Sequence, residues 1–305
     1  MKFYSPLRYP GGKSKIAKFV ALICEKNNIN GNYVEPYAGG ASVALYLLAN
    51  GYVRKITIND YDRAIFAFWH AILNDTEKFC RKIKNIEVTV ENWRKFKAIH
   101  ANKENESLFD LGFAIFFLNR TNRSGIINGG IIGGIAQDGK YKIDCRFRKK
   151  DLIERIELIA SYKKNIHIYN LDALDLIEKI QKKGTNRDTI FYFDPPYYLK
   201  GPSLYFNHYK GDDHKIVSKK IQKIKNARWI VSYDNVPEIK KLYASTRKKE
   251  YTLAYTAYEF RKGKEILFFS NNLIIPRVKN PVQVETMFYE TFNSLKEAHG
   301  QDYKL

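Results

Sequence analysis

The tetrad Asp194-Pro195-Pro196-Tyr197 is the feature of the sequence with the clearest chemical meaning. It follows an apolar, aromatic run at 190–193 that has the length of a β-strand. Proline cannot continue a sheet ladder, so the strand must end there, and open α/β sheets bind their ligands at strand ends. The Asp194 carboxylate and the Pro195 carbonyl can accept the two hydrogens of an amino group, while the Tyr197 ring can cover a planar ligand. Taken alone, the tetrad is also consistent with a plain strand followed by a Pro-Pro turn.

Two glycine-containing turns precede this tetrad in the chain. Residues 7–13 read Leu-Arg-Tyr-Pro-Gly-Gly-Lys, and Lys13 can hold a carboxylate or a phosphate, although the spacing is not that of a P-loop. A plain loop fits this segment equally well. Residues 35–42 read Glu-Pro-Tyr-Ala-Gly-Gly-Ala-Ser and lie between a predicted strand and a predicted helix. They depart from G-x-G-x-x-G, but a glycine-rich turn at a helix N-terminus makes room for an adenosine-type cofactor.

Acidic residues end two further predicted strands. Asp60 follows a strand at 54–59 and lies 25 residues after Glu35, near the distance at which nucleotide-binding folds place an acid on ribose hydroxyls. Asp172 follows a third candidate strand. Each aspartate alone could be a helix N-cap. Because the ends of parallel strands converge on one cleft, acids at successive strand ends together favour a ligand site.

The periodicity of the chain predicts one doubly wound α/β domain with an insertion. Strands and helices alternate at the start of the chain, which is typical of a parallel sheet. Residues 76–120 are helical in pattern with no strand between. Further strand-like runs follow at 165–169, 189–193, 228–233, 251–257 and 265–270. The predicted parts are a discontinuous α/β domain at 1–75 and 151–280, a mostly helical insertion at 76–150 and a polar C-terminal tail at 281–305.

Composition restricts the class of partner and the compartment. The chain has 52 Lys and Arg against 32 Asp and Glu, a formal net charge of +20. This excess is spread along the sequence and favours a folded basic surface that meets a polyanion, although a generally Lys-rich proteome would explain part of it. Three isolated cysteines without C-x-x-C spacing predict a reducing compartment and no zinc site. With no signal peptide and no membrane-length apolar stretch found, we expect a cytoplasmic protein with no membrane partner.

Four motifs in a fixed order carry a family resemblance. They are the segments 7–13, 35–40, 58–60 (Ile-Asn-Asp) and 194–197. In this order the chain resembles the Dam-like DNA adenine methyltransferases of the alpha motif order, over about residues 5–275. The resemblance implies a Rossmann-like methyltransferase sheet, S-adenosylmethionine as cofactor, no metal, and methylation of the exocyclic amine of an adenine flipped out of double-stranded DNA. A cognate restriction endonuclease is a candidate partner.

The resemblance also implies roles for individual residues. Asp194 and Pro195 would hold the target amine, and Tyr197 would stack on the flipped adenine. Tyr9 replaces a more common Trp, and the turn at 37–40 lacks the family's frequent Phe. Together with the acid-ending strands, this gives the predicted cofactor-binding residues Tyr9, Lys13, Glu35, Gly39, Asp60, Asp172 and Asp194.

The insertion contains polar and basic residues suited to nucleic acid. Asn and Arg make bidentate contacts with adenine and guanine edges, and basic and aromatic residues interleave at 139–150. Within the resemblance, this region corresponds to the target-recognition part. The predicted DNA-binding residues are Asn119, Arg120, Asn122, Arg123, Lys140, Tyr141, Arg146 and Arg148. A helix C-terminus with dipole-matching arginines, followed by a solvated hairpin, is the alternative interpretation.

Three other functions share parts of this pattern. Methylation of a cytosine amine uses the same chemistry, but the Asp of the tetrad and the opening motif argue against it. A DNA-binding protein without catalysis would keep the fold, but the intact Lys13 and Asp194 disfavour it. An RNA target remains open, since a charge of +20 does not distinguish RNA from duplex DNA.

Overall fold

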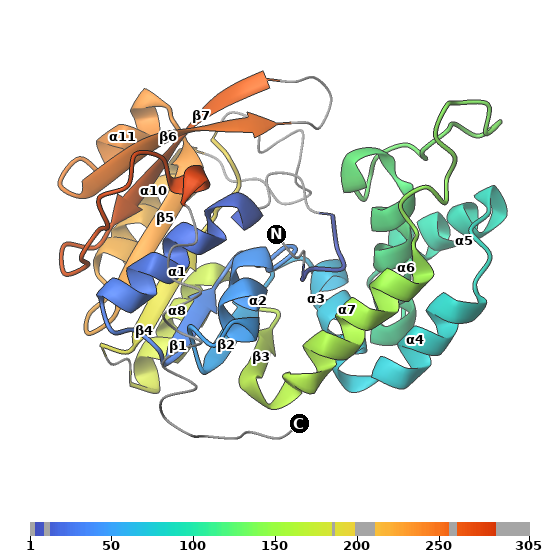
Figure 1. The fold of residues 1–305 in the computed structure, drawn as a ribbon, viewed down its shortest axis with the longest axis horizontal. Helices are drawn as coiled ribbons and strands as arrows, with labels where there is room; N and C mark the ends of the chain where they lie inside the picture. Colours follow the sequence, from blue (N-terminus) through green and yellow to red (C-terminus); the bar gives the residue numbers. More distant parts are fainter. Residues whose placement is uncertain (1–3, 9–12, 185–186, 199–210, 256–260, 285–305) are drawn as a thin grey trace.

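A seven-stranded β-sheet forms one side of the molecule in the computed structural model, and a group of helices forms the other (Figure 1). The structure describes residues 4–8, 13–184, 187–198, 211–255 and 261–284. The strand order is β3-β2-β1-β4-β5-β7-β6, in which β1 to β5 run parallel and β7 runs antiparallel to both of its neighbours. The strands are β1 (Asn32–Glu35), β2 (Lys55–Asn59), β3 (Ile166–Tyr169), β4 (Thr189–Phe193), β5 (Arg228–Asp234), β6 (Arg247–Tyr255) and β7 (Arg261–Phe269).

This strand order is the Rossmann order with one antiparallel strand added. A doubly wound Rossmann sheet runs 3-2-1-4-5-6, and here β7 lies between β5 and β6. The direction of winding reverses between β1 and β4, which are direct neighbours. Such a switch point is where doubly wound sheets bind their ligands. The predicted Rossmann-like α/β fold class is therefore confirmed.

Apolar residues on both faces of the strands bury the sheet between two layers of helices. In β4, Ile190 and Tyr192 join one hydrophobic cluster while Phe191 and Phe193 join another, so this strand is buried on both sides. Helices α1 (Ala17–Lys26) and α2 (Ser42–Ala49) pack in the first cluster. Helices α8 (Ala173–Lys182), α10 (Gly211–Gln222) and α11 (Pro237–Leu242) pack in the second. Parallel strands covered on both faces read as continuous apolar runs, which is why this strand was recognisable in the sequence.

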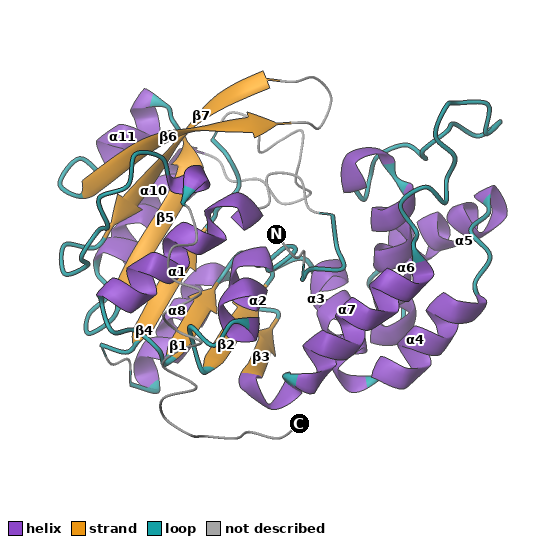
Figure 2. Cartoon of the chain, viewed as in Figure 1, coloured by secondary structure: helices purple, strands orange, loops and turns teal. Residues whose placement is uncertain are grey.

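A group of helices lies beside the sheet and joins β2 to β3 in the chain (Figure 2). The members are α3 (Arg63–Asn74), α4 (Thr76–Asn85), α5 (Val90–Ala101), α6 (Leu108–Thr121) and α7 (Lys149–Ser161). Helices α3 and α6 touch closely at Gly112, where a Cβ atom would lie 2.4 Å from the Ala67 carbonyl oxygen. Among the described residues, none of the helices is both long and apolar enough to cross a bilayer.

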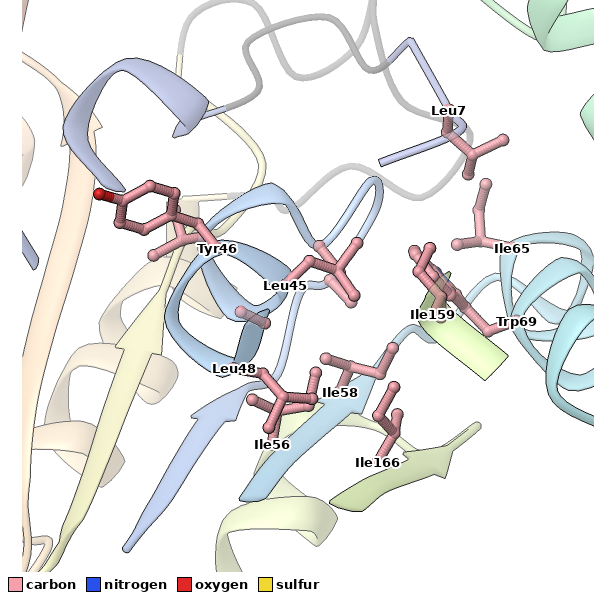
Figure 3. Close-up of a cluster of buried hydrophobic side chains, with 14 of the residues drawn as sticks. Leu7, Leu45, Tyr46, Leu48, Ile56, Ile58, Ile65, Trp69, Ile159 and Ile166 are labelled. Atoms are coloured by element: carbon pink, nitrogen blue, oxygen red, sulfur yellow. The ribbon is translucent and has the colours of Figure 1, made fainter. Parts of the chain in front are cut away.

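One hydrophobic cluster continues from the sheet into these helices. Figure 3 shows Ile58 of β2 and Leu45 of α2 close to Trp69 of α3 and Ile159 of α7. Helices α3 and α7, which flank the insertion in the chain, are thereby packed against the strands, and the same cluster includes Phe116 of α6 within the insertion. The predicted division of the chain at residues 76 and 150 stays a prediction, because the core itself is shared.

Candidate active site

Acidic residues gather at the carboxyl ends of three adjacent strands. Glu35 is the last residue of β1, Asp60 directly follows β2, and Asp194 directly follows β4. Since β1 lies between β2 and β4 and all three are parallel, these carboxylates share one edge of the sheet at the switch point. The strand ends thus bring together three of the predicted site residues.

Asp194 is held by an ion pair with the buried Lys13 and by a hydroxyl. Its Oδ1 atom lies 2.9 Å from Lys13 Nζ and accepts a 2.6 Å hydrogen bond from the Ser232 hydroxyl. The Tyr192 hydroxyl in turn donates to Ser232 at 2.9 Å. Burial raises the pKa of Asp194, and the Lys13 ammonium opposes that rise. The carboxylate is therefore fixed in orientation while remaining a strong hydrogen-bond acceptor.

Tyr197 and Lys13 belong to the same buried group. The Tyr197 hydroxyl donates to Glu265 Oε1 at 2.6 Å and accepts from Lys13 Nζ at 2.9 Å, and the tyrosine is 4% exposed. Burial alone would lower the pKa of Lys13, but the charges of Asp194 and Glu265 outweigh it and hold that pKa well above the usual value. Lys13 is accordingly an ammonium ion, and it binds the tetrad at both its aspartate and its tyrosine.

Glu35 is a buried carboxylate with an oxygen that has no partner in the described part of the chain. The residue is 4% exposed, and its Oε2 atom makes no hydrogen bond. Burial, followed by the neighbouring charge of Asp194, raises the pKa of Glu35 well above its ordinary value. A buried acceptor without a donor is costly, so this oxygen fits a ligand that brings a cation or an N–H group.

Asp60 shapes the glycine turn. Its Oδ2 atom accepts the Gly39 N–H at 2.9 Å, and its Oδ1 atom accepts the Asp62 N–H at 3.0 Å. Gly39 has φ +46°, a left-handed conformation that suits glycine, and its carbonyl accepts from the Trp69 indole at 3.0 Å. Burial, reinforced by the charge of Asp62, raises the pKa of Asp60 to about 7. Each oxygen retains acceptor capacity for a ligand hydroxyl.

Asn59 positions the ends of three strands, a role that its place in the motif at 58–60 did not reveal. Its side-chain amide donates to the Pro36 and Leu171 carbonyls at 2.9 Å each, and its oxygen accepts the Leu171 N–H at 2.9 Å. It thereby ties together the ends of β1, β2 and β3. This role could have been suspected from the sequence, because an Asn at the buried end of a strand is disfavoured unless its amide has hydrogen-bond partners.

Two predicted cofactor residues are less well defined by the structure. Asp172 accepts the Leu174 N–H at 2.8 Å and so caps the N-terminus of α8, as in the alternative interpretation. Its role at a cofactor stays a prediction. Tyr9 lies outside the described residues.

The predicted DNA-binding residues at the end of α6 are buried and internally bonded. Asn119 is 1% exposed, and its side chain pairs with the N–H and carbonyl of Arg8 at 2.7 and 2.8 Å. Arg120 donates to the carbonyls of Arg146 and Pro6. In this structure they fasten the segment before Lys13 to the insertion, and base contacts would require these bonds to break.

Asn122 is also buried and is fully occupied. It accepts from the Trp93 indole at 2.6 Å and donates to the Ile126 and Ile127 carbonyls at 2.9 and 2.8 Å. The remaining predicted DNA-binding side chains are exposed: Arg123, Lys140, Tyr141, Arg146 and Arg148. A contact of any of these residues with DNA stays a prediction.

A Rossmann-like sheet with a glycine turn and acids at its switch point defines an α/β enzyme that binds a nucleotide-type cofactor. The sequence model of the protein family of D12 class N6 adenine-specific DNA methyltransferases matches residues 9–257. The chain therefore belongs to this family, and it is an adenine-specific DNA methyltransferase.

Individual relatives are distant. The chain is 24% identical to the type II methyltransferase M.MjaIII of Methanocaldococcus jannaschii over 205 residues, which cover 63% of this chain and 68% of the relative. Among solved structures, an rRNA methyltransferase from Streptomyces viridochromogenes is 11% identical with a TM-score of 0.36, covering 83% of this chain and 84% of its own. A SAM dependent methyltransferase from Agrobacterium tumefaciens is 10% identical with a TM-score of 0.38, covering 83% of this chain and 60% of its own.

Proposed function

We propose that this enzyme transfers a methyl group from S-adenosylmethionine to the N6 amine of an adenine that is flipped out of double-stranded DNA. The observation that carries the proposal is the oriented, partly buried Asp194 carboxylate at the end of β4, beside the switch point. Family membership supports the base and the reaction. Duplex DNA and base flipping are part of the proposal, because the amine of a paired adenine lies inside the base stack and reaches the Asp194 carboxylate only if the base is turned out.

The residues at the strand ends fit the cofactor. The Oε2 atom of Glu35, which has no hydrogen-bond partner among the described residues, offers an acceptor for the amino group of the methionine part, and Asp60 offers acceptors for the ribose hydroxyls. Gly39, beside Asp60, leaves the turn without a side chain at that point. When bound, S-adenosylmethionine supplies an electrophilic methyl group on a positively charged sulfur.

Asp194 and Pro195 prepare the target amine. The exocyclic nitrogen of adenine is a weak nucleophile because its lone pair is delocalised into the ring. Hydrogen bonds from its two N–H groups to the Asp194 carboxylate and the Pro195 carbonyl localise that lone pair on nitrogen. As the N–C bond forms and the S–C bond breaks, the nitrogen loses one proton, and Asp194 is the adjacent group whose raised pKa suits it to accept that proton. Positioning and electrostatics supply most of the rate.

Tyr197 is proposed to cover the flipped adenine. The centre of its ring lies 5.0 Å from the Lys13 ammonium, and the residue is 4% exposed, so little of the ring is open to a base in this structure. Base entry therefore requires the described side chains around the ring, Lys13 among them, to move. Fluorescence of 2-aminopurine at the target position tests this step, since flipping unstacks that base and raises its emission.

The exposed residues of the insertion are proposed to contact DNA. Arg123, Lys140, Arg146 and Arg148 place four cations and Tyr141 one exposed ring on the segment that follows α6. Lysine and arginine on such a surface neutralise phosphates, and the net charge of +20 supports the same partner.

The experiment that tests the function is methyl transfer from labelled cofactor to duplex DNA, followed by nucleoside mass spectrometry. N6-methyladenine is the expected product. A methylated cytosine, or activity on RNA alone, would contradict the proposal. The type II name of the archaeal relative supports a cognate restriction endonuclease as partner. In that case methylation in cells should protect the recognition site from one restriction enzyme.

A further inference from the structure

Glu265 is a buried carboxylate at the centre of the tetrad's contacts. It lies on β7, is 0% exposed, and accepts the Tyr197 hydroxyl on Oε1 at 2.6 Å. Its second oxygen accepts the hydroxyl of Tyr251, its direct cross-strand neighbour on β6. The Lys13 ammonium lies 3.8 Å from Oε1. A carboxylate is rarely placed in such a position unless its charge has a use.

Strand β5, which pairs with β7, holds Tyr198, the residue that follows Tyr197. Asp234 is the cross-strand neighbour of Glu265 on β5, and it accepts the Tyr198 N–H at 3.0 Å. Two consecutive residues of the tetrad loop are thus each held by an acid from an adjacent strand. The Tyr197 ring is fixed in place by its hydroxyl end.

The balance of charges at the site suggests a second role for the Glu265 carboxylate. One ammonium, that of Lys13, is shared by two carboxylates, at 2.9 Å from Asp194 and 3.8 Å from Glu265. On Asp194, Oδ1 already accepts from both Lys13 and Ser232, which fills its lone pairs. While Lys13 stays there, it neutralises the carboxylate that must attract the positive charge developing on the adenine amine.

We propose that Glu265 is a positioning residue for methyl transfer, which anchors the Tyr197 ring and binds the Lys13 ammonium when Asp194 takes up the target amine. The inference rests on the proposed function and adds a residue to it. Movement of the ammonium away from Asp194 and toward Glu265 would release Asp194 while the lysine charge keeps a buried carboxylate partner. Glu265 touches neither the base nor the methyl group and acts through Lys13 and Tyr197.

Glu265→Gln tests the inference, because it removes the charge and keeps the shape. We expect kcat for adenine methylation to fall at least tenfold, the 2-aminopurine signal to weaken, and KM for S-adenosylmethionine to change less than threefold. Glu250→Gln, the same change at an exposed acid on β6, is the matched control and should behave as wild type. A role confined to folding would lower the melting temperature and leave kcat of the folded enzyme unchanged, which would overturn the inference.

A double-mutant cycle with Lys13→Ala separates the two parts of the proposal. If Glu265 acts through Lys13, the losses in kcat from Glu265→Gln and Lys13→Ala should be clearly less than multiplicative when combined. Multiplicative losses would overturn the ammonium-binding part. Should Glu265→Gln fail to fold, Tyr197→Phe removes the hydroxyl that Glu265 holds and keeps the stacking ring; at least a fivefold loss of kcat is expected, and an unchanged kcat overturns the anchor.

Failure of this inference is distinguishable from failure of the proposed function. If wild type methylates adenine in duplex DNA while Glu265→Gln matches it in kcat and 2-aminopurine signal, only the inference is wrong. If wild type transfers no methyl group to adenine under any DNA condition, the proposed function itself is wrong.

Discussion

Glu35, Asp60 and Asp194 are carboxylates at the ends of adjacent strands, of which Glu35 is buried and the two aspartates are partly buried. Burial is the largest cause of the raised pKa of each. Their surroundings nevertheless differ: Asp194 has an ammonium partner, Asp60 has backbone N–H donors, and Glu35 has an oxygen with no partner among the described residues. The three acids are therefore suited to three different ligand groups, an amine that reacts, hydroxyls that donate and a cation that pairs.

Asp60 should make cofactor binding depend on pH near neutrality. Its pKa in the folded protein is about 7, and the ionised form is the better acceptor for ribose hydroxyls. Affinity for S-adenosylmethionine should therefore weaken about tenfold from pH 8 to pH 6, as the carboxylate takes up a proton. Calorimetric titration at several pH values measures this, and Asp60→Asn, which cannot ionise, should bind weakly with a flat profile.

The raised pKa of Asp60 also affects folding stability, which should fall with rising pH, whereas cofactor affinity should rise. Because the pKa of Asp60 is higher in the folded than in the unfolded chain, its contribution to folding is complete at low pH and is lost as pH rises through about 7. Cofactor-free Asp60→Asn should consequently gain in melting temperature relative to wild type at pH 8 and gain less at pH 5. Equal gains in melting temperature at both pH values would show that folding does not raise the pKa of Asp60.

The elements around the site differ in how well the sequence predicted them. The strand runs at 165–169, 189–193 and 228–233 were predicted to within one residue at each end, since each is rich in β-branched and aromatic residues and is followed by Asn or Asp. Helix α6 was predicted, but the orientation of its last turn was not. Residues 109 and 111–121 are buried, so the helix has no polar face from which a direction could be inferred.

Polar residues inside strands were the other weakness of sequence reasoning. Ser232 and Glu265 complete the contacts of Asp194 and Tyr197, yet they come from β5 and β7, far along the chain. Their importance arises only when strand order brings them beside β4 and the tetrad. The motif residues could be predicted because local sequence defines them, whereas these partners depend on tertiary pairing.

Arg120 and Arg123 provide a matched test of the insertion. Arg120→Ala removes buried hydrogen bonds to the Arg146 and Pro6 carbonyls and should destabilise folding by about 1–3 kcal/mol, with the DNA affinity of the folded protein unchanged. Arg123 is exposed, and Arg123→Ala should instead weaken DNA binding with little change in melting temperature. Denaturant unfolding and binding isotherms at several salt concentrations measure the two effects.

The salt series also separates two modes of contact for Arg123. A phosphate contact predicts uniform weakening across sequences and a salt slope smaller by about one unit. A base contact predicts a loss of discrimination of about 1–3 kcal/mol at one position. Unchanged DNA binding by Arg123→Ala would place the recognition surface elsewhere.

The molecule as a whole combines a cofactor sheet and a helical insertion through one shared core. The hydrophobic cluster that includes Ile58 of β2 also includes Phe116 of α6, so strand ends and insertion cannot shift independently without disturbing packing. Asn119 adds a polar link from α6 to the segment that leads to Lys13. DNA held by the insertion would thus lie at a fixed distance from the methyl-transfer site.

This shared core predicts that cofactor binding stabilises the whole chain. At a cofactor concentration 100 times its Kd, the free energy of unfolding should rise by about 2.7 kcal/mol. Thermal unfolding should then remain a single transition that moves to higher temperature. Two transitions, of which one ignores the cofactor, would mean that the insertion unfolds separately from the sheet.

The most direct test of the central claim is the nucleoside composition of duplex DNA incubated with S-adenosylmethionine and either wild type or Asp194→Ala. Wild type should produce N6-methyladenine, and Asp194→Ala should produce none above background while retaining DNA binding, because the exposed basic residues proposed to contact DNA lie on the insertion, away from Asp194 in the chain. Asp194→Ala turnover within tenfold of wild type, or a product other than N6-methyladenine, would contradict the account.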